Sequence, residues 1–122
     1  MSWDATLYDD RGHVEGDWNY THNCNRMIAE AYELATGDET PPCGGPLGPA
    51  IGPAWWDRLN GADGTAGYAY LSAIMKGLES DPQRFRAMNP PNGWGDYDSL
   101  LKVLRAMRDC LPEWPTRWEV HG

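Results

Sequence analysis

The amino-acid sequence predicts an α+β domain in which a small, mostly antiparallel sheet packs against three to four helices. Segments near both ends of the chain alternate between polar and apolar residues, as half-buried strands do. The segments between them carry apolar residues at helical spacing. With 122 residues, the chain is expected to form a single domain over residues 1–122.

The first strand and the second are predicted to form a β-hairpin. Residues Ser2–Tyr8 alternate, and Asp9–Gly12 supplies the turn. The second strand follows at once. Because successive side chains of a strand point to opposite faces, one face should carry His13, Glu15, Asp17, Asn19 and Thr21, and the other Val14, Trp18, Tyr20 and His22.

The helices are predicted from apolar periodicity and from signals at their ends. The expected ranges are Asn23 to about Ala35, Pro53–Leu59, Thr65 to about Leu78, Pro82–Met88, and a long helix that Asp96 caps and Pro112 ends. Arg117–His121 alternates as a last strand that could join the hairpin. Between the first two helices, residues 38–53 are rich in proline and glycine, so we expect a loop there that is a lid, an interface arm or disordered.

The amino-acid composition limits the classes of partner that the protein is expected to bind. A net charge of −8 repels polyanions, so we expect no duplex nucleic acid partner. A small anionic ligand remains compatible, because salt screens the net charge beyond roughly 8–10 Å. Three cysteines without C-x-x-C spacing and without a signal peptide predict a cytoplasmic protein, and no apolar run approaches the roughly 18–20 residues of a membrane span.

No catalytic residue, metal or cofactor is predicted. Asp4, His13, Glu15 and Asp17 carry groups that a metal-assisted hydrolase could use, and Asp4 and Asp17 could share acid–base work if the first two strands bring them together. His22, however, should point to the opposite face from His13, so the spacing of possible metal ligands is poor.

Recognition without catalysis is the remaining interpretation. The predicted ligand-binding residues are Trp18, Asn19, Tyr20, Thr21, Asn23, Arg26 and Trp94. The amides and hydroxyls suit a base or a ribose, the aromatic rings suit stacking on a base, and Arg26 suits a phosphate. The alternative is that Asn19 and Thr21 only tie the strand to the next segment and that Asn23 only caps the first helix.

Seven tryptophans and six tyrosines are many for so small a core. The adjacent Trp55 and Trp56 lie beside the proline-rich segment, so we expect both to be exposed on the surface of a single chain. Their burial in an interface between two copies would then favour a homo-oligomer.

Two segments, Trp18–Asn23 (WNYTHN) and Asn92–Leu101 (NGWGDYDSLL), resemble small accessory proteins of tailed bacteriophages, especially those of actinobacteria. The resemblance covers most of the chain and implies a phage protein that acts in the host cytosol. Small phage proteins include sponges that sequester nucleotide immune signals, and this anti-defence function is the leading hypothesis. A protein–protein inhibitor of a host enzyme is the alternative, with a metal-assisted hydrolase behind it.

Overall fold

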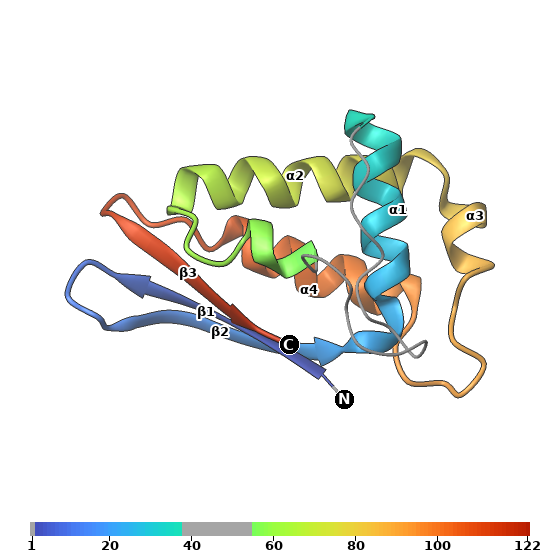
Figure 1. The fold of residues 1–122 in the computed structure, drawn as a ribbon, viewed down its shortest axis with the longest axis horizontal. Coiled ribbons are helices and arrows are strands. Elements are labelled where there is room, and N and C mark those ends of the chain that lie inside the picture. Colours follow the sequence, from blue (N-terminus) through green and yellow to red (C-terminus); the bar gives the residue numbers. More distant parts are fainter. Residues whose placement is uncertain (1, 38–54) are drawn as a thin grey trace.

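The computed structural model describes residues 2–37 and 55–122, and it confirms the α+β class. Its strands are β1 (Ser2–Asp9), β2 (Val14–Thr21) and β3 (Thr116–His121). Its helices are α1 (Asn25–Thr36), α2 (Gly64–Ser80), α3 (Pro82–Arg86) and α4 (Tyr97–Asp109), with short 3₁₀ helices η1 (His22–Cys24) and η2 (Trp55–Arg58). The helices all lie on one side of the sheet (Figure 1). The segment predicted as a loop, residues 38–53, lies outside the described residues.

The sheet is antiparallel with the order β2-β1-β3, so the last strand joins the hairpin as predicted. β1 lies in the middle and turns Trp3, Ala5 and Leu7 toward the helices, where all three are fully buried. β3 alternates in the same way, with Trp118 and Val120 buried. The opposite face of the sheet is polar, and no described helix covers it (Figure 1).

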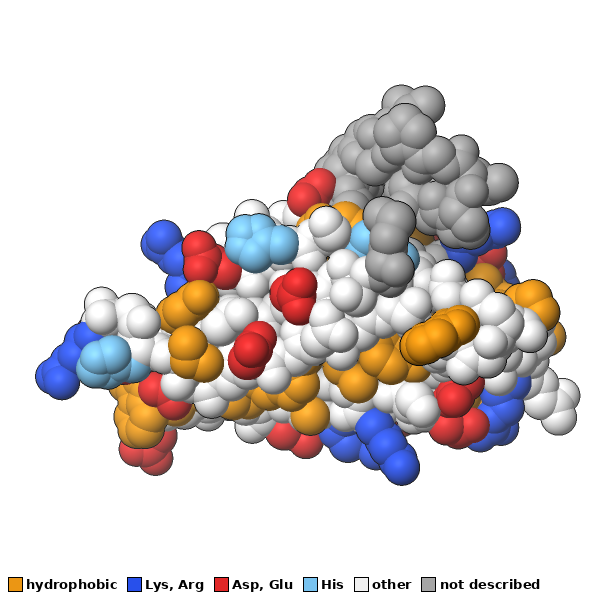
Figure 2. Space-filling view, turned by 90° about the horizontal axis from the view of Figure 1, so that it is seen from below, with side chains coloured by type: hydrophobic (Ala, Val, Ile, Leu, Met, Phe, Trp, Pro, Cys, Tyr) orange, Lys and Arg blue, Asp and Glu red, His pale blue; other side chains and the backbone are white. Residues whose placement is uncertain are grey.

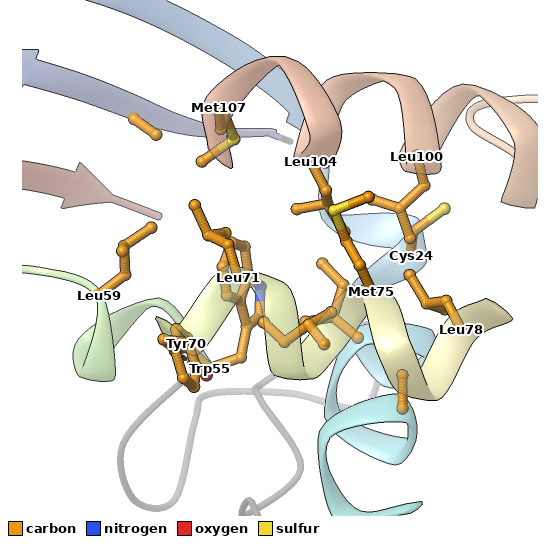
Figure 3. Close-up of a cluster of buried hydrophobic side chains, with 14 of the residues drawn as sticks. Cys24, Trp55, Leu59, Tyr70, Leu71, Met75, Leu78, Leu100, Leu104 and Met107 are labelled. Carbon is orange, nitrogen blue, oxygen red and sulfur yellow. Dashed lines mark hydrogen bonds between the residues drawn. The ribbon is translucent and has the colours of Figure 1, made fainter. Parts of the chain in front are cut away.

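The core lies between the sheet and the helices, and helices α2 and α4 pass close to each other within it (Figure 3). α1 crosses α2 where Gly77 meets the backbone of Ala31, and a Cβ at Gly77 would collide with the Ala31 carbonyl. A residue without a side chain is therefore required at this crossing. The buried stripe of α2 turns away from Ala66 and Ala69, which are exposed.

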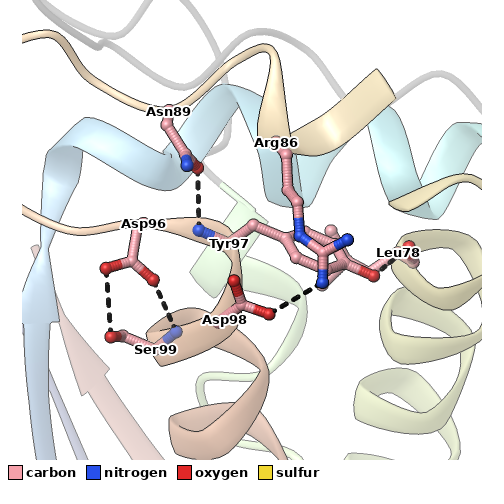
Figure 4. A network of polar contacts seen from close by, with 7 residues as sticks. All are labelled: Leu78, Arg86, Asn89, Asp96, Tyr97, Asp98 and Ser99. Atoms are coloured by element: carbon pink, nitrogen blue, oxygen red, sulfur yellow. Dashed lines mark hydrogen bonds and ion pairs between the residues drawn. The ribbon is translucent and has the colours of Figure 1, made fainter. Parts of the chain in front are cut away.

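The start of α4 agrees with its prediction (Figure 4). The Asp96 carboxylate accepts a hydrogen bond from the Ser99 N–H at 2.7 Å, which is an N-cap. The next residue, Tyr97, is buried, and its hydroxyl donates to the Leu78 carbonyl at 2.7 Å. The Asn89 side chain accepts from the Tyr97 N–H at 2.8 Å, so the turn before α4 is tied to the helix start.

The expected exposure of Trp55 is wrong. Trp55 is fully buried, stands edge-on to Trp3 at 5.1 Å between ring centroids, and donates its indole N–H to the Asn25 side chain at 3.0 Å. Trp56 is half-buried and stacks on His22, with ring centroids 5.2 Å apart. Because Trp55 finds its partners inside the fold, homo-oligomer formation loses its main reason and stays a prediction.

Candidate functional site

An open hollow of about 680 Å³ lies where β2 leads into η1, and five of the seven predicted ligand-binding residues line it. These five are Asn19, Tyr20, Thr21, Asn23 and Trp94, and Ser2, Asn92 and Gly95 complete the lining. The hollow therefore joins the two sequence segments that carry the phage resemblance, although they are far apart in the chain.

Tyr20 joins the two walls of the hollow. Its hydroxyl accepts from the Asp96 N–H at 3.1 Å and donates to the Asp96 carbonyl at 3.2 Å, while its ring packs against Trp3 at 6.2 Å between centroids. Burial raises the pKa of the Tyr20 hydroxyl, so it stays protonated and keeps its donor at neutral pH. Tyr20 therefore positions the segment that leads into α4.

The segment Asn92–Gly95 holds Trp94 at the rim of the hollow. The Asn92 side chain accepts from the Trp94 N–H at 3.0 Å, which forms a tight Asx turn. Gly95 has a φ of +89° and lies against β2, where a Cβ would stand 2.5 Å from the Thr21 methyl carbon. Trp94 itself is 71% exposed, so its ring is available to a ligand.

Amide groups supply the polar contacts of the hollow. The Asn19 side-chain nitrogen donates to the Asp4 carboxylate at 2.8 Å and to the Ser2 hydroxyl at 3.0 Å. These bonds fix the orientation of the amide, and its oxygen accepts no hydrogen bond from the described residues. The Asn23 side-chain nitrogen donates to the Trp94 carbonyl at 3.3 Å. Asn19 and Asn23 thus both tie the hollow together and line it.

The prediction that Asn23 caps the first helix is wrong. A turn of 3₁₀ helix, η1, comes before α1, and the Thr21 hydroxyl accepts from the Asn23 N–H at 3.2 Å to cap that turn. α1 then begins after Cys24, which makes no side-chain cap bond. Threonine and asparagine are both good capping residues. Here Thr21 is the cap, and the Asn23 side chain instead donates to the Trp94 carbonyl.

Arg26 lies outside the hollow, beside it. It is exposed in the first turn of α1 and lines a smaller hollow of about 370 Å³ together with Asn23, Glu30 and Arg84. Arg84 pairs with Glu30 at 3.5 Å, whereas Arg26 has no ion pair within residues 2–37 and 55–122. Asn23 lines both hollows, so only the Asn23 side chain separates the hollow that Arg26 lines from the larger one.

The structure places Trp18 away from the other predicted site residues. Its ring lies over Gly16, which has no side chain to obstruct it, and packs against Trp118 with centroids 5.6 Å apart. Trp18 therefore contributes to the half-buried rim of the core.

The candidate hydrolase residues are not brought into one metal site. Asp17 accepts from the Thr6 hydroxyl at 3.2 Å, and Asp4 from Asn19. His13 instead faces Asp9 in the hairpin turn at 3.6 Å. Within the described part of the chain, no group of three or more His, Cys, Asp or Glu residues could hold a metal ion.

Cys24 lies beneath the hollow but is a poor nucleophile. Its side chain is fully buried, and burial raises the pKa of its thiol to about 11. At neutral pH the thiol is therefore protonated, and the reactive thiolate is rare.

Ser2, Asn92 and Gly95 belong to the hollow but were missed by the sequence reasoning. The composition of Asn92–Gly95 signals a rigid turn that presents Trp94, yet it carries no information about which strand the turn contacts. That contact depends on the Tyr20–Asp96 hydrogen bonds, which join residues 76 positions apart.

In comparisons with protein-family models, with curated proteins and with solved structures, nothing matches this chain. Among the described helices, none is long and apolar enough to span a membrane.

Proposed function

We propose that this chain is a phage accessory protein that binds a small nucleotide-type ligand in the hollow and thereby sequesters it in the host cytosol. The single observation that carries this proposal is Trp94, a 71% exposed indole fixed at the rim of a hollow lined by amides and hydroxyls. The phage origin and the cytosolic setting rest on the resemblance of the two sequence segments that build this hollow.

A nucleobase fits the aromatic part of the site. An exposed tryptophan on a rigid turn offers a flat surface at small entropic cost, because the Asn92 turn and the Gly95 contact already fix its backbone. Stacking of a base on such a ring contributes about 1–3 kcal/mol.

A base edge or a ribose fits the polar part. The Asn19 amide oxygen, held in place by the bonds of its nitrogen to Asp4 and Ser2, is a fixed acceptor. Asn92 and Asn23 add amides, and Ser2 and Thr21 add hydroxyls. Fixed polar groups around an aromatic surface are typical of small-molecule sites, in which they set the orientation of the ligand.

A phosphate fits the adjoining hollow, where Arg26 and Arg84 are the cationic residues. A cation in the first turn of a helix is opposed by the helix dipole, so Arg26 gains little stability from its position. An anion held between Arg26 and the start of α1 would interact favourably with both. Asn23 lines both hollows, so a nucleotide with its base at Trp94 and its phosphate at Arg26 would lie across Asn23.

Sequestration, rather than turnover, is favoured by the chemistry of the lining. The described residues of the main hollow offer amides, hydroxyls and aromatic rings, whereas general acid–base work at neutral pH commonly uses histidine or a carboxylate.

Calorimetry and thermal-shift measurements with cyclic dinucleotides and ADP-ribose derivatives test the proposal. We expect saturable binding that Trp94→Ala weakens by about 1–3 kcal/mol, with little change in Tm because the ring is exposed. Arg26→Ala should weaken binding by about 1.5–3 kcal/mol, the scale of a hydrogen bond to a charged group.

Trp114→Ala is the matched control, because Trp114 is 52% exposed but lies outside the hollow. Its loss should leave affinity unchanged. Absence of binding to every nucleotide tested would overturn the proposal, and chromatography that finds the ligand cleaved after incubation would replace sequestration with hydrolysis.

A further inference from the structure

The two edges of the sheet differ in how many of their outward backbone groups are hydrogen-bonded. The outer edge of β3 is covered by the segment Asn60–Ala62. Trp118 donates its N–H to the Ala62 carbonyl and accepts from the Gly61 N–H, both at 2.8 Å, and the Val120 N–H donates to the Asn60 side chain at 3.0 Å. These bonds use the N–H and C=O of Trp118 and the N–H of Val120, which β3 turns away from β1, so this edge is covered at the middle of the strand.

The same bonds fix which backbone groups point where in the rest of the sheet. In an antiparallel strand the N–H and C=O of one residue point to the same side, and successive residues alternate. Since the backbone N–H and C=O of Trp118 point away from β1, those of Glu119 point toward β1, where Glu119 pairs with Thr6. The backbone groups of Thr6 therefore point toward β3, and those of its neighbour Ala5 point toward β2.

On β2 this alternation leaves the edge open at Asp17 and Asn19, whereas the Glu15 carbonyl, nearer the hairpin turn, already accepts from the Cys110 thiol at 3.8 Å. Ala5 pairs with Trp18, so the backbone N–H and C=O of Trp18 point toward β1. The backbone groups of its neighbours Asp17 and Asn19 therefore point outward, away from the sheet. In residues 2–37 and 55–122, no hydrogen bond reaches the backbone N–H or C=O of Asp17 or Asn19 on this outer side. Both residues also have exposed side chains, so the edge is reachable from solvent.

The side chains around this edge are acidic. Asp17 stands on the uncovered face of the sheet, where its partner on β1 is Thr6. On the same face, Asp4 of β1 lies two residues from Thr6, opposite Asn19, and Glu119 of β3 pairs with Thr6 from the other side. Figure 2 shows this face, with acidic side chains spread across it. A strand added beside β2 would place a side chain opposite Asp17, at about 5 Å between Cβ atoms.

We propose that the outer edge of β2 at Asp17 and Asn19 accepts an extended segment of a partner protein, with Lys or Arg at the positions that face Asp17. Backbone hydrogen bonds to the edge supply the affinity and the carboxylates select a basic strand, as in β-strand addition. This proposal does not rest on the ligand proposed for the hollow.

A second copy of this chain is a poorer occupant. Two antiparallel β2 strands paired edge to edge around Asp17 would place the Asp17 side chains of both copies opposite each other, and like charges that face each other across strands are destabilising. Each copy also has a net charge of −8, which opposes the approach.

The probe is the peptide acetyl-(Lys-Val)4-amide, with acetyl-(Glu-Val)4-amide as the control, both added to the full chain. Amide hydrogen exchange followed by NMR should show that the Lys peptide slows exchange at Asp17 and Asn19 at least tenfold, while the Glu peptide leaves it unchanged. Raising the salt from 0.1 M to 1 M shortens the screening length from about 10 Å to 3 Å and should weaken binding.

Two variants separate the backbone from the charge. Asp17→Pro removes an N–H that points outward, so it should reduce affinity at least tenfold and spare the β1–β2 hydrogen bonds. Asp17→Asn keeps the N–H and should bind more weakly with less dependence on salt. If Asp17→Pro fails to fold, as judged by circular dichroism, Asp17→Asn and the exchange data still decide.

Unchanged exchange at Asp17 and Asn19 with millimolar Lys peptide would overturn the proposal, as would equal binding of the Glu peptide. Protection of these two amides that grows with protein concentration, without any peptide, would assign the edge to a second copy instead. Nucleotide binding that depends on Trp94 is measured separately, so either proposal can fail alone.

Discussion

Gly95 lies so close to Thr21 that a Cβ on Gly95 would stand 2.5 Å from the Thr21 methyl carbon. This contact brings the turn that carries Trp94 against the end of β2, so the hollow depends on the absence of one side chain. Gly95 also has a positive φ of +89°, which other residues rarely adopt.

Gly95→Ala should therefore destabilise the fold by about 2–4 kcal/mol, because the strained backbone and the clash act together. Gly93→Ala is the matched control: Gly93 has a φ of +75°, but a Cβ added there would meet no described atom within 4 Å. It should lose only about 1 kcal/mol, from the backbone alone. Urea unfolding measures both, and equal losses would show that the Gly95–Thr21 contact is loose.

Tyr20→Phe should lower the free energy of unfolding by about 1–2 kcal/mol, because the Asp96 N–H loses its acceptor in a half-buried place. Tyr68→Phe is the control, since Tyr68 is 43% exposed and its hydroxyl makes no hydrogen bond to the described residues. Thermal unfolding of both variants checks this. If Tyr20→Phe is as stable as the native chain, Tyr20 does not hold the two walls together.

Stability should fall as the pH is lowered from 7.5 to 5.5, with His22 contributing to the loss. Burial lowers the pKa of His22 in the folded state below its ordinary value of 6.5. The unfolded chain therefore takes up the proton first, and protonation favours unfolding below pH 6.5.

Urea unfolding at several pH values should show that His22→Gln flattens this dependence. Hydrogen bonds from backbone amides and from Arg86 lower the pKa of Asp9 and Asp98, respectively, so their stabilisation is lost only at more acidic pH. An unchanged slope in His22→Gln would mean that the imidazole titrates alike in both states.

Local signals explain which parts of the fold are predictable. The cap at Asp96 and the apolar stripe of α4 are encoded within a few residues, and the structure confirms both. The hairpin is equally local, because the alternation of β1 and the Asp9–Gly12 turn specify it, and Tyr20 lies on the side of Trp3. A register shift after Leu7 pairs Val14 with Tyr8 and leaves Val14 58% exposed, so the prediction that Val14 shares a face with Trp18 and Tyr20 is wrong.

The parts that differ depend on contacts between distant segments. Asn23 is a good capping residue, yet its amide binds the Trp94 carbonyl, and Thr21 caps a 3₁₀ turn that the periodicity does not reveal. Trp55 is expected to be exposed beside a proline-rich segment, but it finds Asn25 and Trp3 inside the core. The hollow itself needs Tyr20 to meet Asp96, and no pattern within either segment specifies that pair.

The central position of β1 has a consequence for the order of folding. β1 pairs on one side with its hairpin neighbour and on the other with β3, which nearly the whole chain separates from it. During synthesis the hairpin is complete early, but its Trp3 face stays without β3 until the last described strand emerges. Contacts of such long sequence separation form late and slow folding, so the sheet should be completed only after the helices have assembled.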